Sequence, residues 1–279
     1  MSSITFGCQT YTWQMSGPSQ YDSLEHIIGV GAAAGFTGLE PEMIMLGRLS
    51  DPVRLKSALE AKRMKLGALC LVEDWLGTTE TAKERAEADV VIRNLKTYFP
   101  STLLALCQMP GTDRSHLQER QRNLLACANS VARRAVSQGV HCTYHPNSPP
   151  GSIFRTADDY QVLLNGLDAS ACGYAPDLGH IAKGGMDPLT VVKTYRSLVN
   201  HLHFKDMASD GSWAAMGEGV IDFTGVVRFL QQTGYQGWIM VEDECPRAEH
   251  DPDGATAHNG AYVREQLMPL TVSTTSQAR

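Results

Sequence analysis

The sequence predicts an α/β fold of the (β/α)8 TIM-barrel type, a closed ring of eight parallel strands with helices outside. Eight short apolar segments of the strand type alternate with segments of helical period along the chain, which is the pattern of parallel βαβ units. The length of 279 residues also suits such a barrel. We predict one domain over residues 1–270 and a disordered polar tail over residues 271–279.

The strand-like segments are short, apolar and bounded by turn residues, and several end in polar side chains. Pro176 fits the end of a strand better than its middle, because proline donates no hydrogen bond to a neighbouring strand. We expect strands at residues 4–13, 36–40, 65–72, 103–108, 140–145, 172–177, 199–206 and 237–241.

The helical segments carry start and stop signals. Ser19 and Asp22 form an expected capping box for a helix that Gly35 ends. Pro52 fits the first turn of the next helix, and Thr156 begins a second capping box. We expect the remaining helices to run over residues 52–63, 81–98, 113–138, 156–167, from 187 onward, and over 223–233 and 257–268.

The composition argues against nucleic-acid and membrane partners. The formal net charge is −6 and the chain has no block of Lys and Arg, so no phosphate-binding surface is expected. No stretch has the length and apolarity of a membrane span or a signal peptide, and we predict a cytoplasmic protein that binds a small molecule. The seven cysteines form no CxxC pair and are expected to be reduced core thiols.

The most informative stretch is residues 199–206, which we expect to be the seventh strand. Its period-2 alternation places His201, His203 and Lys205 on one face and Leu202 and Phe204 on the other, as in a buried strand with one chemically active side.

Asp177, His203 and Glu242 stand at the expected ends of strands six, seven and eight, 26 and 39 residues apart. Because the carboxyl ends of barrel strands open on one mouth, these side chains should meet. Two carboxylates and an imidazole suit Mn²⁺, Co²⁺, Fe²⁺ or Zn²⁺. His145, at the end of strand five, is a fourth ligand or a general base. Taken singly, such an Asp is also a helix cap and such a His a core residue.

Five stretches of the second half of the chain resemble the sugar phosphate isomerase/epimerase superfamily, whose barrel is of the xylose isomerase-like type. Before strand five the resemblance is architectural only. The stretches are Tyr144-His145-Pro146-Asn147, Pro176-Asp177-Leu178-Gly179-His180, His201-Leu202-His203-Phe204-Lys205-Asp206, Gly217-Glu218-Gly219-Val220-Ile221-Asp222-Phe223 and Gly234-Tyr235-Gln236-Gly237-Trp238-Ile239-Met240-Val241-Glu242.

The resemblance implies one divalent metal ion at the ends of strands five to eight, Mn²⁺ in first place with Co²⁺, Fe²⁺, Zn²⁺ or Mg²⁺ as alternatives. Its ligands would be Asp177, His203 and Glu242, with His145 as the fourth. Epimerases of this group have a Glu where this chain has His145. That difference favours a lyase or dehydratase, and Tyr-His-Pro at this strand resembles the inosose dehydratase branch.

The function implied is that of an isomerase, epimerase or dehydratase acting on a keto-sugar or keto-cyclitol. It would remove a proton α to a carbonyl and form a metal-stabilised enediolate. Glu242 or His145 would take the proton, while His180 and Lys205 would orient the substrate or protonate the leaving oxygen. The alternative interpretations are a hydrogen-bonding partner of a ligand for His180 and an ion pair with Asp206 or another carboxylate for Lys205.

Three further residues are candidates for substrate binding. Glu40 would accept hydrogen bonds from substrate hydroxyls, although a solvated loop acid is the alternative. Trp13 and Trp213 would stack on a sugar face, with ordinary packing as the alternative.

The sequence is also compatible with other functions. The chain resembles barrel subunits that cleave 3-oxo-glycosides (C-glycosides) with a small partner subunit, and a sugar-binding barrel without turnover fits as well. A metal phosphodiesterase of the abasic-site type is disfavoured by the acidic charge. We expect a homo-oligomer or a complex with a small partner. No Gly-rich phosphate loop follows strands seven and eight, which favours an unphosphorylated sugar.

Overall fold

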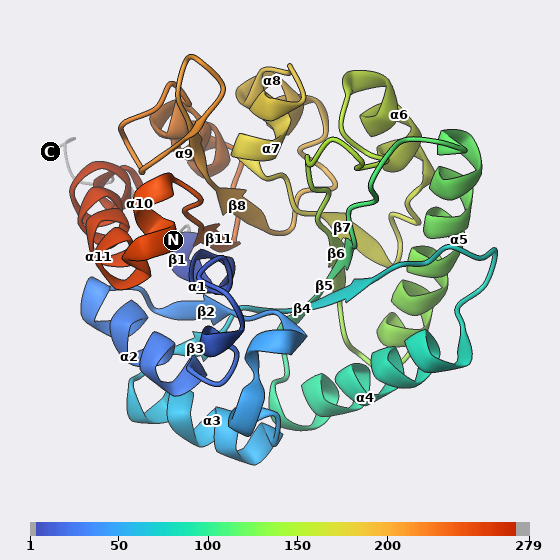
Figure 1. The fold of residues 1–279 in the computed structure, drawn as a ribbon, viewed down its shortest axis with the longest axis horizontal. Coiled ribbons are helices and arrows are strands. Elements are labelled where there is room, and N and C mark those ends of the chain that lie inside the picture. Colours follow the sequence, from blue (N-terminus) through green and yellow to red (C-terminus); the bar gives the residue numbers. More distant parts are fainter. Residues whose placement is uncertain (1–3, 272–279) are drawn as a thin grey trace, which may run out of the picture.

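Parallel strands form a closed ring in the computed structural model, which describes residues 4–271 (Figure 1). One sheet has the order β3-β2-β1-β11-β8 and the other the order β4-β5-β6-β7. The strands of the first are β1 (Ile4–Gln9), β2 (Gly38–Glu40), β3 (Lys65–Leu66), β8 (Leu202–Phe204) and β11 (Gly237–Val241). Those of the second are β4 (Ala68–Glu73), β5 (Leu103–Gln108), β6 (Cys142–Tyr144) and β7 (Cys172–Tyr174).

Isolated bridges join the two sheets at both seams. Glu42 bridges to Cys70 beyond β2, and Asp177 bridges to His203 beyond β7. Because β3 and β4 together form the third strand, the ring has eight strand positions and the predicted barrel is confirmed. The predicted tail lies, apart from Thr271, outside the described residues.

Helices surround the ring of strands (Figure 1). They are α1 (Tyr11–Gln14), α2 (Leu24–Ala34), α3 (Pro52–Ala61), α4 (Ala82–Tyr98), α5 (Leu117–Val136), α6 (Ala157–Gly166), α7 (Leu178–Lys183), α8 (Pro188–Thr194), α9 (Phe223–Gln232), α10 (Pro246–His250) and α11 (Pro252–Tyr262). Single turns η1 (Pro18–Gln20), η2 (Met43–Met45), η3 (Gly47–Leu49), η4 (Val263–Leu267) and η5 (Met268–Thr271) and a short hairpin of β9 (Asp206–Met207) and β10 (Trp213–Ala214) complete the structure. Within residues 4–271 no helix has the length and apolarity to span a membrane.

Several predicted boundaries are wrong. Residues 11–14 form a helical turn rather than the end of the first strand. The Ser19–Asp22 capping box does not exist, because Asp22 accepts a hydrogen bond from the backbone of Arg48 (2.7 Å) instead. Helix α5 begins at Leu117, because His116 has left-handed backbone angles (φ 52°) that interrupt a helix. By contrast, Thr156 does form its capping box.

The core of the described residues consists of one large cluster and two small ones. Most buried apolar side chains pack between the strands and the surrounding helices. On β4 and β5 a separate buried cluster contains only the small residues Ala68, Cys70, Ala105 and Cys107. Small side chains occupy little of the barrel interior there, and two of them, Cys70 and Cys107, line an open cavity.

Candidate metal and substrate site

A cavity of about 430 Å³ opens at the carboxyl ends of the strands. This volume is in the range of small-molecule sites, and the end of the barrel at which it opens is the one that carries active sites in this fold. Its walls include Gln9 at the end of β1, Glu42 after β2, Cys107 and Gln108 on β5, His145 after β6, His180 on α7 and Glu242 after β11.

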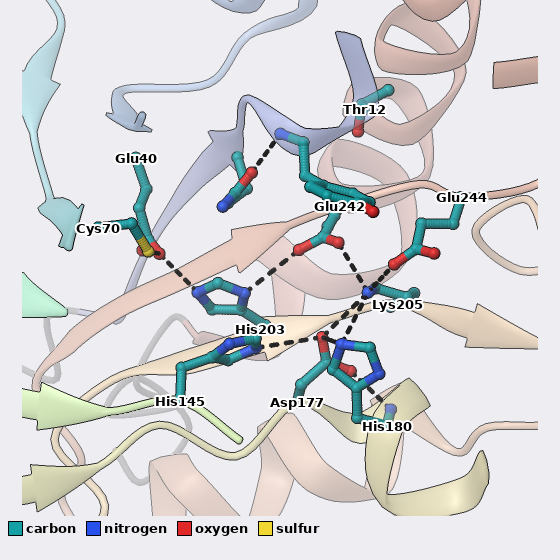
Figure 2. Close-up of polar contacts among 12 residues, drawn as sticks. Thr12, Glu40, Cys70, His145, Asp177, His180, His203, Lys205, Glu242 and Glu244 are labelled. Carbon is teal, nitrogen blue, oxygen red and sulfur yellow. Dashed lines mark hydrogen bonds and ion pairs between the residues drawn. The ribbon is translucent and has the colours of Figure 1, made fainter. Parts of the chain in front are cut away.

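His145, Asp177, His203 and Glu242 converge at the carboxyl ends of the strands (Figure 2), and two of them, His145 and Glu242, also line the cavity. His145 Nε2 lies 3.6 Å from Asp177 Oδ2, and His203 Nδ1 lies 3.4 Å from Glu242 Oε2. The rings of His145 and His203 are 4.2 Å apart. Asp177, His203 and Glu242 each offer a ligand atom within 4.8 Å of the others. The strand ends therefore bring together the four side chains expected to meet.

Three ligand-type atoms in this group are buried without a hydrogen-bond partner: His145 Nε2, Asp177 Oδ2 and His203 Nδ1. Buried polar atoms are nearly always satisfied, because leaving one unpaired costs about 1–3 kcal/mol. Two imidazole nitrogens and a carboxylate oxygen aimed at one place fit a divalent cation, which would take all three lone pairs.

The charges of the two imidazoles agree with this fit. Burial alone would lower the pKa of His203, but Glu40 and Glu242 raise it to about 9. Burial likewise opposes protonation of His145, yet Cys107 and Asp177 raise its pKa well above the ordinary value. The carboxylates around His145 and His203 thus favour positive charge on both rings. A metal cation can supply that charge in place of the two protons, which must leave before the nitrogens can bind it.

Glu40 lies behind His203 and is fully buried. Its two oxygens contact His203 Nε2 at 2.9 Å and His201 Nε2 at 2.5 Å. Burial would raise the pKa of Glu40, but these two imidazoles lower it well below its ordinary value. The expectation that Glu40 binds substrate is wrong, because its two carboxylate oxygens are taken up by the buried rings of His201 and His203.

Lys205 is fully buried among carboxylates. Its ammonium lies 2.7 Å from Glu242 Oε1 and 3.5 Å from Asp177 Oδ2, and it also contacts Glu244 (Figure 2). Burial opposes its charge, yet these carboxylates raise the pKa of Lys205 well above its ordinary value. Lys205 is thus a fixed cation of the site, in agreement with the ion-pair interpretation. Its partners do not include Asp206, which accepts hydrogen bonds from backbone amides of the following loop.

His180 is held from both sides. Its Nε2 lies 3.2 Å from Lys205 Nζ and its Nδ1 lies 2.7 Å from Ser148 Oγ. Burial, together with the charges of Lys205 and His145, lowers the pKa of His180 to about 3. The ring is therefore neutral, with Nε2 accepting from the ammonium and Nδ1 donating to Ser148. This arrangement suits positioning of Lys205 better than donation of a proton.

Helix α7 places His180 beside the ligands. Asp177 is the N-cap of this helix, and its Oδ1 accepts a hydrogen bond from the backbone N–H of His180 (2.8 Å). The cap uses Oδ1 and leaves Oδ2 directed at the site. Asp177 is therefore both a helix cap and a candidate ligand, and the two interpretations of this residue do not compete.

Two carboxyl groups of the cavity wall were not expected from the sequence. Burial raises the pKa of both Glu42 and Glu244 to about 7, the range suited to exchange of protons at neutral pH. Glu42 follows Glu40 by two residues and Glu244 follows Glu242 by two. Glu40 and Glu242 were selected as strand ends, and extending the two-residue alternation one step beyond each of them could have found Glu42 and Glu244.

The tryptophans separate into a cavity residue and a packing residue. Trp213 lines the cavity and meets the His180 ring edge to face at 5.8 Å, so its role in substrate binding stays a prediction. Trp13 is only 1% exposed, and its Nε1 donates to Asp253 (2.8 Å). The prediction that Trp13 contacts substrate is wrong, since its indole packs against the region of α11.

Comparison with known proteins places this geometry in a family. An inosose dehydratase from Clostridium botulinum is 24% identical over 88% of this chain and 90% of its own length. The structure of AsbF, a probable 3-DHS dehydratase from Bacillus anthracis, superposes with a TM-score of 0.71 at 15% identity over 95% of this chain and all of that one. The IolI protein with a bound zinc atom superposes with a TM-score of 0.71 at 14% identity, covering 96% and 98% of the two chains.

The model of the xylose isomerase-like TIM barrel family matches residues 29–266, which include every strand position of the ring after β1. The chain therefore belongs to the xylose isomerase-like TIM barrel family.

Proposed function

We propose that this protein is a divalent-metal-dependent enzyme of the sugar isomerase, epimerase or dehydratase type, acting on a keto-sugar or keto-cyclitol. The observation that carries the proposal is that buried atoms of His145, Asp177 and His203 that form no hydrogen bond converge beside Glu242, and that His145 and Glu242 line a cavity. The inosose dehydratase relative and the dehydratase and zinc-containing neighbours support it.

Asp177, His203 and Glu242 would hold the ion, with His145 as a fourth ligand. Their donor set of carboxylate and imidazole suits Mn²⁺, Fe²⁺, Co²⁺ or Zn²⁺. A divalent ion bound there supplies Lewis-acid polarisation of a substrate carbonyl, which acidifies the neighbouring C–H.

Proton transfer falls to side chains that line the cavity. Burial would raise the pKa of Glu242, but Lys205 and His203 lower it to about 2, so Glu242 stays an anion and suits ligation. His145 and Glu42 stand on the walls of the same cavity. We assign the removal and return of the proton α to the carbonyl to Glu42, because its pKa of about 7 lets it take and return a proton at neutral pH.

Lys205 and His180 complete the machinery. The Lys205 ammonium holds Asp177 and Glu242 at fixed positions through its ion pairs. The neutral His180 ring accepts a hydrogen bond from that ammonium and so fixes its direction. Both residues act on the ligand carboxylates and are positioning residues in this proposal.

The proposal is tested by metal analysis and solvent exchange on the same preparation. Protein purified without chelator should contain about one divalent ion per chain. In D₂O, proton NMR over a panel of inososes, ketohexoses and 3-keto-glucosides should show deuterium entering one of them or water leaving it. EDTA should stop the reaction and Mn²⁺ should restore it. Metal-free protein with undiminished turnover would contradict the proposal.

Variants separate the site from the fold. His203→Ala should lose the ion and the activity while its circular dichroism spectrum stays native, because His203 is a candidate ligand. His141→Ala is the matched control, since His141 is exposed and directly precedes β6, at the amino end of the strand. Loss of the fold in His203→Ala would instead indicate a structural role for this residue.

A further inference from the structure

Within residues 4–271, two cations on one wall of the cavity form no ion pair with a carboxylate that lines it. Arg155 stands just before α6 and Lys183 is the last residue of α7, and both line the cavity. The residue after Lys183 lies against Arg155, because a Cβ atom on Gly184 would be 2.0 Å from the carbonyl oxygen of Arg155. The two side chains therefore start from neighbouring points of the rim.

The surroundings of these cations differ from those of Lys205. In the part of the chain that the structure describes, Arg155 and Lys183 form no ion pair with Asp or Glu, whereas Lys205 contacts three carboxylates. Arg155 Nε is buried without a hydrogen-bond partner. Lys183 Nζ donates to the carbonyl of Gly211, lies 4.9 Å above the Trp213 ring and interacts electrostatically with Asp210 on the following hairpin, which does not line the cavity. A guanidinium with an unsatisfied N–H that shares a cavity wall with an ammonium suits the binding of a carboxylate or phosphate.

The charge of Arg155 and Lys183 is opposite to that of another part of the cavity wall. The chain carries a net charge of −6, so its overall field does not attract anions. The carboxyl groups that line the cavity are Glu42, Glu242 and Glu244, which belong to segments after β2 and β11. The wall formed by the segment before α6 and by α7 is cationic, and the wall formed by the segments after β2 and β11 is acidic.

Helix α7 links Lys183 to the candidate ligands through His180. Lys183 follows His180 by three residues on α7, which is about 4.5 Å along a helix axis. His180 Nε2 is 3.8 Å from Asp177 Oδ2. Arg155 and Lys183 line the same cavity as His145 and Glu242, so a substrate that places its carbonyl at the candidate ligands shares this cavity with the cationic wall.

From this we infer that Arg155 and Lys183 form a subsite for an anionic terminal group, so that the substrate is a keto acid or a phosphorylated keto-sugar rather than a neutral sugar. This inference rests on the proposed function for the carbonyl end of the substrate. It departs from the unphosphorylated sugar favoured by the sequence, because the cationic wall consists of side chains rather than of a Gly-rich loop.

The test compares neutral and anionic probes on the same protein. Fructose, fructose 6-phosphate and 5-ketogluconate present a ketone with no charge, a phosphate and a carboxylate. Binding is measured by isothermal titration calorimetry on EDTA-treated protein, and deuterium exchange is measured on the Mn²⁺-loaded protein. We expect at least one anionic probe to bind more than tenfold tighter than fructose. Arg155→Gln and Lys183→Gln should each lower this ratio at least fivefold, and Arg155→Lys should recover part of it.

Lys62→Gln is the matched control, because Lys62 is an exposed lysine at the end of α3, and it should keep the wild-type ratio. A preference for phosphate over carboxylate, or the reverse, identifies the terminal group. Equal binding of all three probes, or a ratio that neither variant changes, overturns the inference. Selective anion binding without deuterium exchange on any probe would leave the subsite in place and count against the proposed function instead.

Discussion

His203 Nε2 lies 2.9 Å from Glu40 Oε1, while Nδ1 of the same ring faces Glu242. A carboxylate behind an imidazole fixes the orientation of the ring and the nitrogen that it presents. Glu40→Gln keeps the shape but weakens this hydrogen bond. We therefore expect the variant to bind Mn²⁺ or Zn²⁺ about 10–100-fold more weakly, as measured by competition with a chelating dye.

Glu25→Gln serves as the control for this experiment, because Glu25 is exposed on α2. Both variants should give native circular dichroism spectra. If Glu40→Gln binds metal as tightly as wild type, then Glu40 does not orient His203 for ligation.

The sequence could predict Asp177, His203 and Glu242 because each follows an apolar strand, and closure of the ring makes strand ends neighbours. The sequence could not distinguish the role of Glu40 from that of Glu42, because residues two apart at a strand end are expected on the same face. Which of the two enters the cavity depends on His201 and His203, and these contact Glu40 from a strand more than 160 residues away.

The shortest helices could not be predicted from the sequence pattern. Helix α7 has six residues, too few for a periodic pattern, so its N-cap at Asp177 was recognised only as a general alternative. Trp13 was placed on a strand, but residues 11–14 turn into a helix that directs its indole to Asp253. In both cases a tertiary contact decides the local structure.

Asp177 has two functions that substitutions can separate. Asn keeps a side-chain oxygen that can cap α7, whereas Ala removes the cap and costs about 0.5–2 kcal/mol. Asp177→Asn and Asp177→Ala should both lose the metal, because neither supplies an anionic Oδ2. Urea denaturation of the EDTA-treated proteins should show Asp177→Asn to be more stable by about 1 kcal/mol. Equal stability of the two variants would speak against the capping role of Oδ1.

Glu42 should make stability depend on pH. Its pKa is raised by burial from 4.5 to about 7, so the folded state binds more protons than the unfolded state between these values. The free energy of unfolding therefore falls as pH rises through this window. In Glu42→Gln this contribution disappears, and the variant should gain about 1–3 kcal/mol relative to wild type between pH 4.5 and 8.

The measurement is urea denaturation of EDTA-treated protein at several pH values, with Glu25→Gln as the exposed control. The quantity of interest is the difference in unfolding free energy between variant and wild type. A difference that stays constant from pH 4.5 to 8 would mean that Glu42 titrates in the folded protein as it does in the unfolded chain.

Lys205 neutralises buried carboxylates, and its removal should therefore destabilise the metal-free protein. In Lys205→Met the charges of Asp177 and Glu242 lose their nearest cation, and breaking a buried pair in this way costs about 3–5 kcal/mol. A divalent ion held by the same carboxylates would offset part of the loss, so saturating Mn²⁺ should raise the melting temperature of Lys205→Met more than that of wild type. Lys62→Met, at an exposed lysine, is the control. A loss below 1 kcal/mol without metal would show that Asp177 and Glu242 do not depend on this ammonium.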